Sequence, residues 1–150
     1  MTLSATPHLN FHGEAREALA FYADAFDGGS TITTYADLGM PAGLPDSDKV
    51  VFGAAFSADG FSVMAYDVPG QAEPRTASTT RRENGTTITD ASFFVALGGG
   101  SLEEVTGPWN ALSDGATVIE PLAASAWSAG FGMLTDRFGV TWAVSVTPAS

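Results

Sequence analysis

The chain contains only two histidines, and both lie in a short segment near its start. In His8-Leu9-Asn10-Phe11-His12 polar and apolar residues alternate, as is typical of a β-strand with one face on a core and the other in a wetter environment. His8 and Asn10 would then face a cleft, where a histidine could act as a general base near neutral pH. The alternative is that these are ordinary hydrogen-bonded groups at a sheet surface, with His12 capping the helix that follows.

Aromatic side chains form a second set of candidates. Trp127, Ala129, Phe131 and Met133 alternate along one predicted strand, and Trp142 lies on the strand predicted to pair with it. Such a stripe more often packs a core, but aromatic side chains in a cleft would also bind an aromatic or aliphatic molecule, with Tyr35 adding a hydroxyl. The residues predicted to contact a ligand are His8, Asn10, Tyr35, Met64, Trp127, Phe131 and Trp142.

Composition limits which partners the protein can have. There is no cysteine, so a metal ion would need His, Asp or Glu ligands. A net charge of −11 repels phosphate backbones and anionic lipid, which argues against nucleic-acid and membrane partners. Arg81-Arg82 is the only local basic pair. It could meet an anionic ligand at a cleft mouth or decorate a loop.

The sequence also lacks several signals of location and catalysis. No apolar run approaches the roughly 20 residues of a membrane helix, and the start lacks the regions of a secretion signal. We therefore expect a soluble, cytoplasmic protein of one compact domain spanning residues 1–150. No Ser-His-Asp order, paired catalytic carboxylates or phosphate-binding loop stands out.

The first half is predicted to be βαβββ. A helix follows the His8 strand, because apolar residues fall on one helical face from Glu14 to Phe26. Residues 30–35 are rich in β-branched side chains and predict a strand, residues 38–48 a loop, and residues 50–57 and 61–66 a hairpin with an Asp-Gly turn. This first module spans about residues 5–67.

The second half repeats this order after a polar segment, residues 68–88, which is predicted to be a linker or a mobile loop. Residues 91–97 predict a strand, 98–100 a hinge and 101–113 a helix opened by a Ser101–Glu104 capping box. Pro108 predicts a kink in this helix, or two short turns. Residues 117–119, 127–135 and 140–146 predict three further strands, so the second module spans about residues 89–147.

An internal repeat links the two halves. Placing Asp27-Gly28 on Asp114-Gly115 also places Gly13 on Gly100 and Tyr22 on Trp109. Each unit would leave one sheet face without a helix, and two such units curving together would enclose a cleft. The alternative is an accidental βα similarity within an ordinary α+β domain.

The opening Pro7-His8-Leu9-Asn10-Phe11-His12-Gly13 and the closing segment from Thr135 to Trp142 resemble PhnB-like proteins. These belong to the vicinal oxygen chelate, or glyoxalase/bleomycin resistance/dioxygenase, superfamily. The resemblance runs almost to the C-terminus and implies an α+β fold of two tandem βαβββ modules, with curved mixed sheets enclosing a cleft. It also implies a homodimer.

Catalytic members of that superfamily hold a divalent metal ion with four side chains, from the first and last strand of each module. Here those positions fall on Pro7 or His8, on Phe94 or Val95, near Met64, and on Ala143. At most one ligand survives, so we predict no metal site and no cofactor. A relocated site using His8, His12 and Asp67 is conceivable, although the spacing does not support it.

Two function classes follow. The first is a metal-independent binding protein that takes a small hydrophobic or aromatic ligand in the cleft between the modules. The second is an enzyme, a divalent-metal-dependent lyase, isomerase or dioxygenase with a displaced metal site, or one using His8 as a base. Members of this branch are also labelled demethylubiquinone methyltransferases. The sequence disfavours that role because it lacks a glycine-rich loop between a strand and a helix followed by an acidic residue on a second strand, and Gly98–Gly100 alone is a weak signal that more often marks a hinge.

Overall fold

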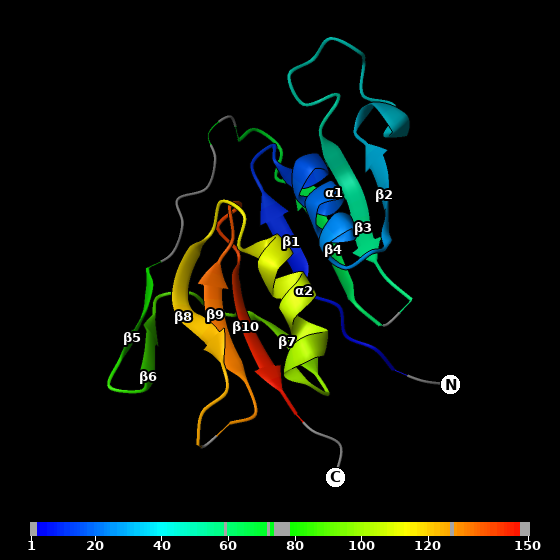
Figure 1. Cartoon of the computed structure of the whole chain (residues 1–150). Helices are drawn as coiled ribbons and strands as arrows, with labels where there is room; N and C mark the ends of the chain where they lie inside the picture. Colours follow the sequence, from blue (N-terminus) through cyan, green and yellow to red (C-terminus); the bar gives the residue numbers. More distant parts are fainter. Residues whose placement is uncertain (1–2, 59, 72, 74–78, 127, 148–150) are drawn as a thin grey trace. The chain divides into compact units, whose positions relative to one another are not determined.

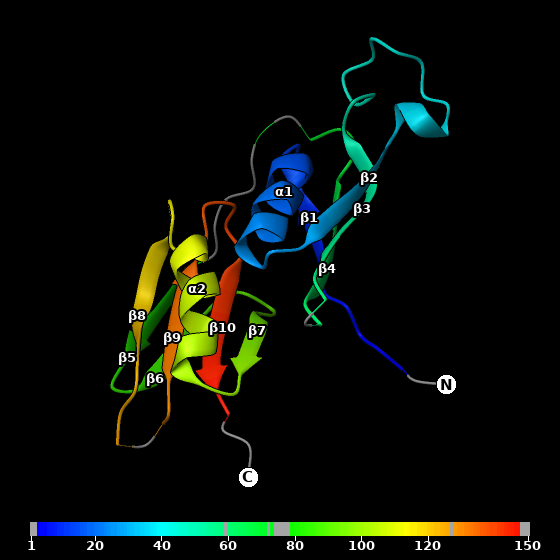
Figure 2. The same ribbon diagram turned by 45° about the vertical axis from the view of Figure 1, so that its right-hand side comes forward.

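The computed structural model describes residues 3–58, 60–71, 73, 79–126 and 128–147. The chain divides into two compact units, unit 1 from Met1 to Arg75 and unit 2 from Thr76 to Ser150. Figures 1 and 2 show each unit as a β-sheet with one helix on one face. Each unit is described separately below.

Unit 1 is a four-stranded mixed sheet covered on one face by helix α1. Its elements are β1 (His8–Phe11), α1 (Ala15–Ala25), β2 (Gly29–Thr34), the short 3-10 helix η1 (Ala36–Leu38), β3 (Val50–Phe56) and β4 (Ser62–Asp67). The strands lie in the order β1-β4-β3-β2. β1 runs parallel to β4, while β4 with β3 and β3 with β2 are antiparallel.

Unit 2 has the same arrangement, preceded by a hairpin. Its elements are β5 (Thr80–Glu83), β6 (Thr86–Thr89), β7 (Val95–Gly99), α2 (Leu102–Leu112), β8 (Thr117–Ala123), β9 (Phe131–Thr135) and β10 (Thr141–Val146). The main sheet has the order β7-β10-β9-β8, and β5 pairs with β6 separately. The order β7-β10-β9-β8 matches β1-β4-β3-β2 strand for strand. The predicted α+β fold of two tandem βαβββ modules is therefore confirmed.

Helix α1 forms where the sequence predicts an amphipathic segment. Ala18, Leu19 and Tyr22 on its apolar face are fully buried. The helix ends at Phe26, and the Gly28 N–H donates to the carbonyl of Ala23 at 2.7 Å. A side chain at Gly28 would collide with the carbonyl oxygen of Phe56. Asp27 thus takes the left-handed conformation of the turn, with a φ of 53°, and the close approach of the adjacent strand requires glycine at position 28.

Helix α2 begins with the predicted cap. The Ser101 hydroxyl accepts from the Glu104 N–H at 3.2 Å, and the Glu104 carboxylate accepts from the Gly100 N–H at 3.1 Å. Pro108 lies inside the helix, but the helix is one continuous element rather than two turns. Its anchors Val105, Trp109 and Leu112 are buried, and this packing offsets the lost backbone hydrogen bond.

A matched pair of glycines lets each helix approach its sheet. Gly53 on β3 lies under α1, where an added Cβ would be 2.5 Å from Leu19 Cδ1. Gly132 on β9 lies under α2, where an added Cβ would be 2.8 Å from Leu122 Cα and 2.9 Å from the Trp109 ring. Both positions therefore need glycine for close packing.

Parts of the sequence prediction were wrong. The predicted linker, residues 68–88, contains β5 and the start of β6, which form a hairpin around Asn84 and Gly85, both with positive φ. The strand predicted at 91–97 is Val95–Gly99, so Gly98 and Gly99 belong to a strand and not to a hinge. The strand predicted at 117–119 extends to Ala123, and the one predicted at 127–135 begins at Phe131.

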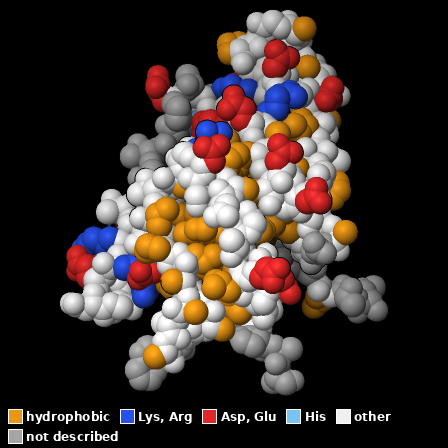
Figure 3. Space-filling model, viewed as in Figure 1, with side chains coloured by type: hydrophobic (Ala, Val, Ile, Leu, Met, Phe, Trp, Pro, Cys, Tyr) orange, Lys and Arg blue, Asp and Glu red, His pale blue; other side chains and the backbone are white. Residues whose placement is uncertain are grey.

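In the part of the chain that the structure describes, no helix has the length and apolar character needed to cross a membrane. The acidic side chains are spread over the face shown in Figure 3 and do not gather in one patch.

Candidate functional site

The sheet of unit 1 has one face without a helix, which we call the open face. Strand register defines it: His8 pairs with Met64, Met64 with Ala54, and Asn10 with Tyr66. The alternate residues of the same strands, such as Leu9, Val63 and Ala65, are buried toward α1. The side chains that β1, β3 and β4 place on the open face are His8, Asn10, Phe52, Ala54, Phe56, Ser62, Met64 and Tyr66.

His8 and Asn10 lie on this open face, opposite Leu9 and Phe11 as the alternation predicts, and they contact each other. Asn10 Oδ1 lies 3.1 Å from His8 Nδ1. An amide oxygen only accepts, so a neutral His8 carries its proton on Nδ1 and Nε2 is left as an acceptor. The His8 ring also meets the Tyr66 ring edge-on, with 5.4 Å between centroids. Both His8 and Asn10 are exposed, so a ligand can reach them.

Tyr35 follows β2 and reaches the end of β4. Its hydroxyl donates to the carbonyl of Asp67 at 2.8 Å. Burial raises the pKa of Tyr35 above its usual 10.0, and the nearby Tyr66, Asp67 and Asp46 raise this pKa further. The phenol therefore stays protonated and keeps donating at neutral pH.

Two phenylalanines on the open face were missed by the sequence analysis. Phe52 is 54% exposed and Phe56 is 44% exposed, which is unusual for large apolar side chains on a sheet. Both belong to β3, whose sequence Val50–Phe56 is apolar throughout. Alternation from Phe52 to Phe56 was the available signal, but an entirely apolar strand does not reveal which of its faces is covered.

In unit 2 the corresponding sheet face is covered by the β5–β6 hairpin. Phe131 and Met133 lie on the face of the sheet opposite α2, because they pair with Ser145 and Ala143. The guanidinium of Arg82, on β5, lies 5.0 Å from the centre of the Phe131 ring. Thr87, on β6, contacts Met133 at 3.5 Å. The β5–β6 hairpin therefore packs on this face, as Figure 2 shows on the side away from α2.

Arg81 and Arg82 are both engaged within unit 2. Arg82 contacts Glu120 at 3.4 Å and donates to Thr87 Oγ1 at 2.8 Å. Arg81 pairs with Glu83 at 2.7 Å. These contacts within unit 2 argue against binding of an anionic ligand by this pair.

Trp142 does not share a face with Phe131. It pairs with Leu134, points toward α2 and is fully buried. Its indole N–H donates to Asp136 Oδ2 at 2.9 Å. Trp142 therefore packs the core of unit 2, and this position does not support its predicted role in ligand contact. Trp127, the other tryptophan predicted to contact a ligand, lies outside the described residues.

Asp67 is a structural carboxylate, which corrects the idea of a relocated metal site. It is 1% exposed and accepts from the backbone N–H groups of Gly13, Ala15 and Val50 at 2.8–3.0 Å. It thus caps α1, the role considered for His12. His12 instead contacts the carbonyl of Glu73 through Nδ1 at 2.9 Å, and His8 lies on the opposite face of the sheet from Asp67.

The superfamily's metal ligands do not fit this chain. Register places Met64 beside His8 in unit 1, and Ala96 beside Ala143 in unit 2. Ala96 thus takes the place expected for Phe94 or Val95. Of these four positions, only His8 carries a side chain that could bind a divalent ion. Such ions need several convergent ligands. Within the described ranges, no group of three or more His, Cys, Asp or Glu side chains could hold a metal ion.

The tandem βαβββ fold is that of the glyoxalase/bleomycin resistance/dioxygenase superfamily. A solved glyoxylase/bleomycin resistance protein/dioxygenase domain from Frankia sp. matches with a TM-score of 0.62 at 10% identity, covering 100% of this chain and 95% of that one. A family model described as 3-demethylubiquinone-9 3-methyltransferase matches residues 4–145. The chain belongs to this PhnB-like family.

Solved structures agree with this assignment. The protein PA1353 from Pseudomonas aeruginosa is 30% identical, with a TM-score of 0.75 over 99% of this chain and 100% of that one. A PhnB protein from Bacillus cereus, described as a putative 3-demethylubiquinone-9 3-methyltransferase, is 22% identical. Its TM-score is 0.70 over 97% of this chain and 100% of that one. At that identity the second likeness shows the fold alone.

Proposed function

We propose that the protein is a metal-independent binding protein that takes a small hydrophobic or aromatic molecule on the open face of unit 1. Phe52, Phe56 and Met64 would supply apolar contact, and His8 Nε2 would accept one hydrogen bond. The sequence predicts a ligand in a cleft between the modules, whereas this proposal rests on unit 1 alone.

The exposure of Phe52 and Phe56 carries the proposal. Covering apolar surface is favourable by about 25 cal/mol per Å², so two half-exposed rings on one face favour an apolar partner. Tyr66 and Met64 extend the same surface, while His8 and Asn10 provide polar groups at its β1 edge. A largely apolar surface with a few fixed polar groups is typical of small-molecule sites.

The donor set supports metal independence. Met64, Ala96 and Ala143 at three of the four expected ligand positions leave His8 alone, which argues against the alternative of a metal-dependent lyase, isomerase or dioxygenase. His8 as a metal-free general base is compatible with the same open face. A substrate would have to place a proton within hydrogen-bond reach of Nε2.

A methyltransferase role remains disfavoured despite the family description. The only glycine-rich segment, Gly98–Gly100, leads from a strand into α2. Packing explains Gly99, because an added Cβ would lie 2.6 Å from Val105 Cγ1. The close approach of the helix to the strand therefore accounts for this glycine without a nucleoside cofactor.

Binding of the neutral dye Nile red tests the open face. We expect the double variant Phe52→Ser/Phe56→Ser to weaken binding about tenfold, because most of the apolar contact is lost. Phe93 is a matched control, since it is also 54% exposed but lies in unit 2. Phe93→Ser should leave the dye affinity within about twofold. Equal losses in both variants would show that the dye does not select the open face.

Metal dependence is tested separately by elemental analysis of protein purified without chelators, and by thermal scans with divalent ions. The proposal expects no stoichiometric metal and no ion-dependent rise in melting temperature. A stoichiometric divalent ion that His8→Ala removes would overturn metal independence and favour the enzyme alternative.

The homodimer and the cytoplasmic location stay predictions. Two-fold dimers are the commonest soluble oligomers, and size exclusion with light scattering measures the oligomeric state directly. A single monomeric species across the concentration range would refute the dimer.

A further inference from the structure

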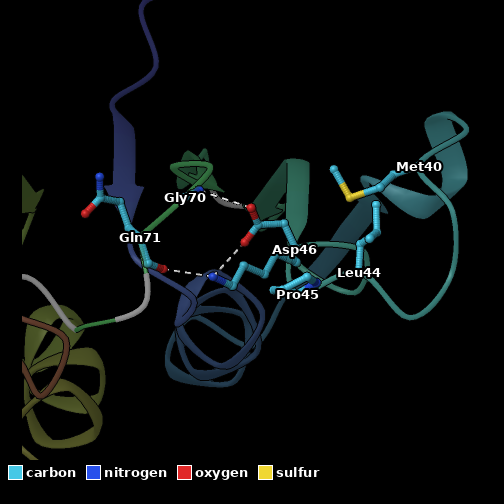
Figure 4. A pocket seen from close by; sticks show the side chains of 7 residues that line it. Met40, Leu44, Pro45, Asp46, Gly70 and Gln71 are labelled. Carbon is cyan, nitrogen blue, oxygen red and sulfur yellow. Dashed lines mark hydrogen bonds and ion pairs between the residues drawn. The ribbon is translucent and has the colours of Figure 1, made fainter.

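Unit 1 contains a cavity that the proposed function does not use. It has a volume of about 410 Å³, within the usual range of small-molecule sites of about 300–1,000 Å³. Figure 4 shows its walls, formed by the loop between η1 and β3 and by the segment after β4. The residues that line it are Met40, Leu44, Pro45, Asp46, Lys49, Gly70 and Gln71.

Polar contacts hold the two walls together. Lys49 Nζ lies 2.9 Å from Asp46 Oδ1 and donates to the carbonyl of Gln71 at 2.8 Å. The Gly70 N–H donates to Asp46 Oδ2 at 3.0 Å. Figure 4 shows these contacts as dashed lines joining the segment after β4 to the loop. The cavity is therefore preformed, which lowers the ordering cost of binding.

The loop is also fixed at its base. The Met40 N–H donates to the carbonyl of Tyr35 at 3.1 Å, and the Ala36 N–H donates to the carbonyl of Ser47 at 2.9 Å. Ser47 is 4% exposed, so the loop is anchored where it rejoins the sheet. The wall that carries Met40 and Leu44 is thus held from both ends.

The lining divides into an apolar part and a polar part. Met40, Leu44 and Pro45 supply apolar contact, and Leu44 is 49% exposed. At the polar end an ammonium has three donors, and the contacts described for Lys49 use two of them. Both Asp46 oxygens already accept hydrogen bonds. This end can therefore donate to a ligand acceptor.

The charge balance indicates what kind of acceptor fits. The ion pair between Asp46 and Lys49 is neutral as a unit, and the whole chain carries a net charge of −11. An anion would be repelled by this field, and a cation would compete with Lys49 for Asp46. An uncharged carbonyl or ether oxygen is not repelled by this field and does not compete with Lys49 for Asp46.

We propose that this cavity is a second small-molecule site, selective for an uncharged ligand with a compact apolar or aromatic group and one carbonyl-type acceptor. The apolar group packs on Met40 and Leu44, and the acceptor oxygen meets the Lys49 ammonium. None of the lining residues belongs to the open face. This site can therefore be tested independently of the proposed function.

Acetophenone, an uncharged aryl ketone, is a suitable probe, with benzoate as its anionic counterpart. In titrations followed by backbone amide NMR, we expect acetophenone to shift Met40, Leu44, Lys49, Gly70 and Gln71. The expected dissociation constant is on the order of 1 mM for so small a ligand, and benzoate should bind at least about fivefold more weakly. Equal or tighter benzoate binding would overturn the ligand class.

Variants locate the probe. Leu44→Ser should weaken acetophenone binding about fivefold, because the ligand covers an already half-exposed side chain. Leu38 is a matched control, since it is 69% exposed on η1 but does not line the cavity. Leu38→Ser should leave the affinity unchanged. Met40→Ser, on the same wall, should weaken binding to a similar extent. Agreement between the two variants would show that the loss does not come from a disturbance of the loop by one of them.

An absence of loop shifts up to the solubility limit of acetophenone would overturn the inference. Equal weakening by Leu38→Ser and Leu44→Ser would overturn it as well. Shifts confined to Asn10, Phe52, Met64 and Tyr66 would also overturn this second site, while supporting binding at the open face.

Discussion

The two units share one strand order but differ in what covers the sheet face without a helix. In unit 2 the β5–β6 hairpin lies on that face, with Arg82 over Phe131 and Thr87 against Met133. In unit 1 no described element of that unit takes that place, and Phe52 and Phe56 are about half exposed. A repeated fold therefore does not imply a repeated site, because a short insertion can fill one copy of the face.

The buried carboxylates differ between the units in a similar way. Asp67 joins groups far apart in sequence, accepting from Gly13, Ala15 and Val50. Asp136 joins its own turn to the strand that follows it, accepting from Phe138, Val140 and the Trp142 indole. The acid of unit 1 thus joins segments that are distant in sequence, while the acid of unit 2 shapes a hairpin.

The largest expected effect comes from removing the Asp67 carboxylate. Asp67→Ala leaves three backbone N–H groups without their acceptor, at about 1 kcal/mol or more each, so the free energy of unfolding should fall by about 3 kcal/mol. Asp136→Ala should cost less, about 2 kcal/mol, because its turn is partly hydrated. Urea unfolding measures both variants. A larger loss for Asp136→Ala would reverse the comparison.

The matched glycines give the next largest effect. Gly132→Ala forces a methyl group against the backbone at Leu122 and should lower stability by about 3 kcal/mol. Gly53→Ala meets mainly the tip of the Leu19 side chain, which can rotate, so a loss of about 1 kcal/mol is expected. Thermal unfolding of the two variants tests this order. Equal losses would mean that α1 is held as rigidly as α2.

Opening the covered face of unit 2 should have a smaller effect. Arg82→Ala removes the contacts to Phe131 and Glu120, and we expect a stability loss of about 1 kcal/mol. It should also increase Nile red binding, because Phe131 becomes accessible. Arg81→Ala is the control, since the Arg81–Glu83 pair is about half exposed. Unchanged dye binding in Arg82→Ala would show that the hairpin covers this face without Arg82.

The smallest effect concerns the ionisation of Tyr35. Its pKa is raised above 10.0, first by burial, so folding favours the neutral phenol. The resulting stability is fully present below pH 10 and is lost as the pH rises through the raised pKa of Tyr35. Ultraviolet titrations of the unmodified protein and of Tyr35→Phe should differ by one tyrosine that ionises above pH 10. A difference between the two curves that is complete by pH 10 would contradict the raised pKa of Tyr35.

Much of the fold could be predicted from the sequence because its signals are local. Amphipathic spacing predicted α1, and the Ser101–Glu104 pair predicted the start of α2. The β5–β6 hairpin was missed although Asn84-Gly85 is a strong turn signal, because its strands are polar and no apolar alternation marked them. Pro108 predicted a kink or two short turns, but α2 is one continuous helix because its buried side chains pack against the sheet.

The candidate site was only partly predictable. Alternation placed His8 and Asn10 on the face opposite Leu9 and Phe11, and the register confirms this arrangement. Trp142 was grouped with Phe131 because the pairing register of their strands cannot be derived from the sequence. A shift of one residue moves every side chain to the other face. The roles of Asp67 and of the loop cavity depend on contacts between distant segments, which a local pattern does not contain.

The two buried acids also have a consequence for the order of folding. Asp136 accepts from three groups two to six residues away, so these contacts can form as soon as that short segment is made. Asp67 lies 52 residues after Ala15, so α1 lacks its cap until β4 has left the ribosome. Contacts of such sequence separation form late. Pulse-labelled hydrogen exchange should therefore show protection at Val140 before protection at Ala15.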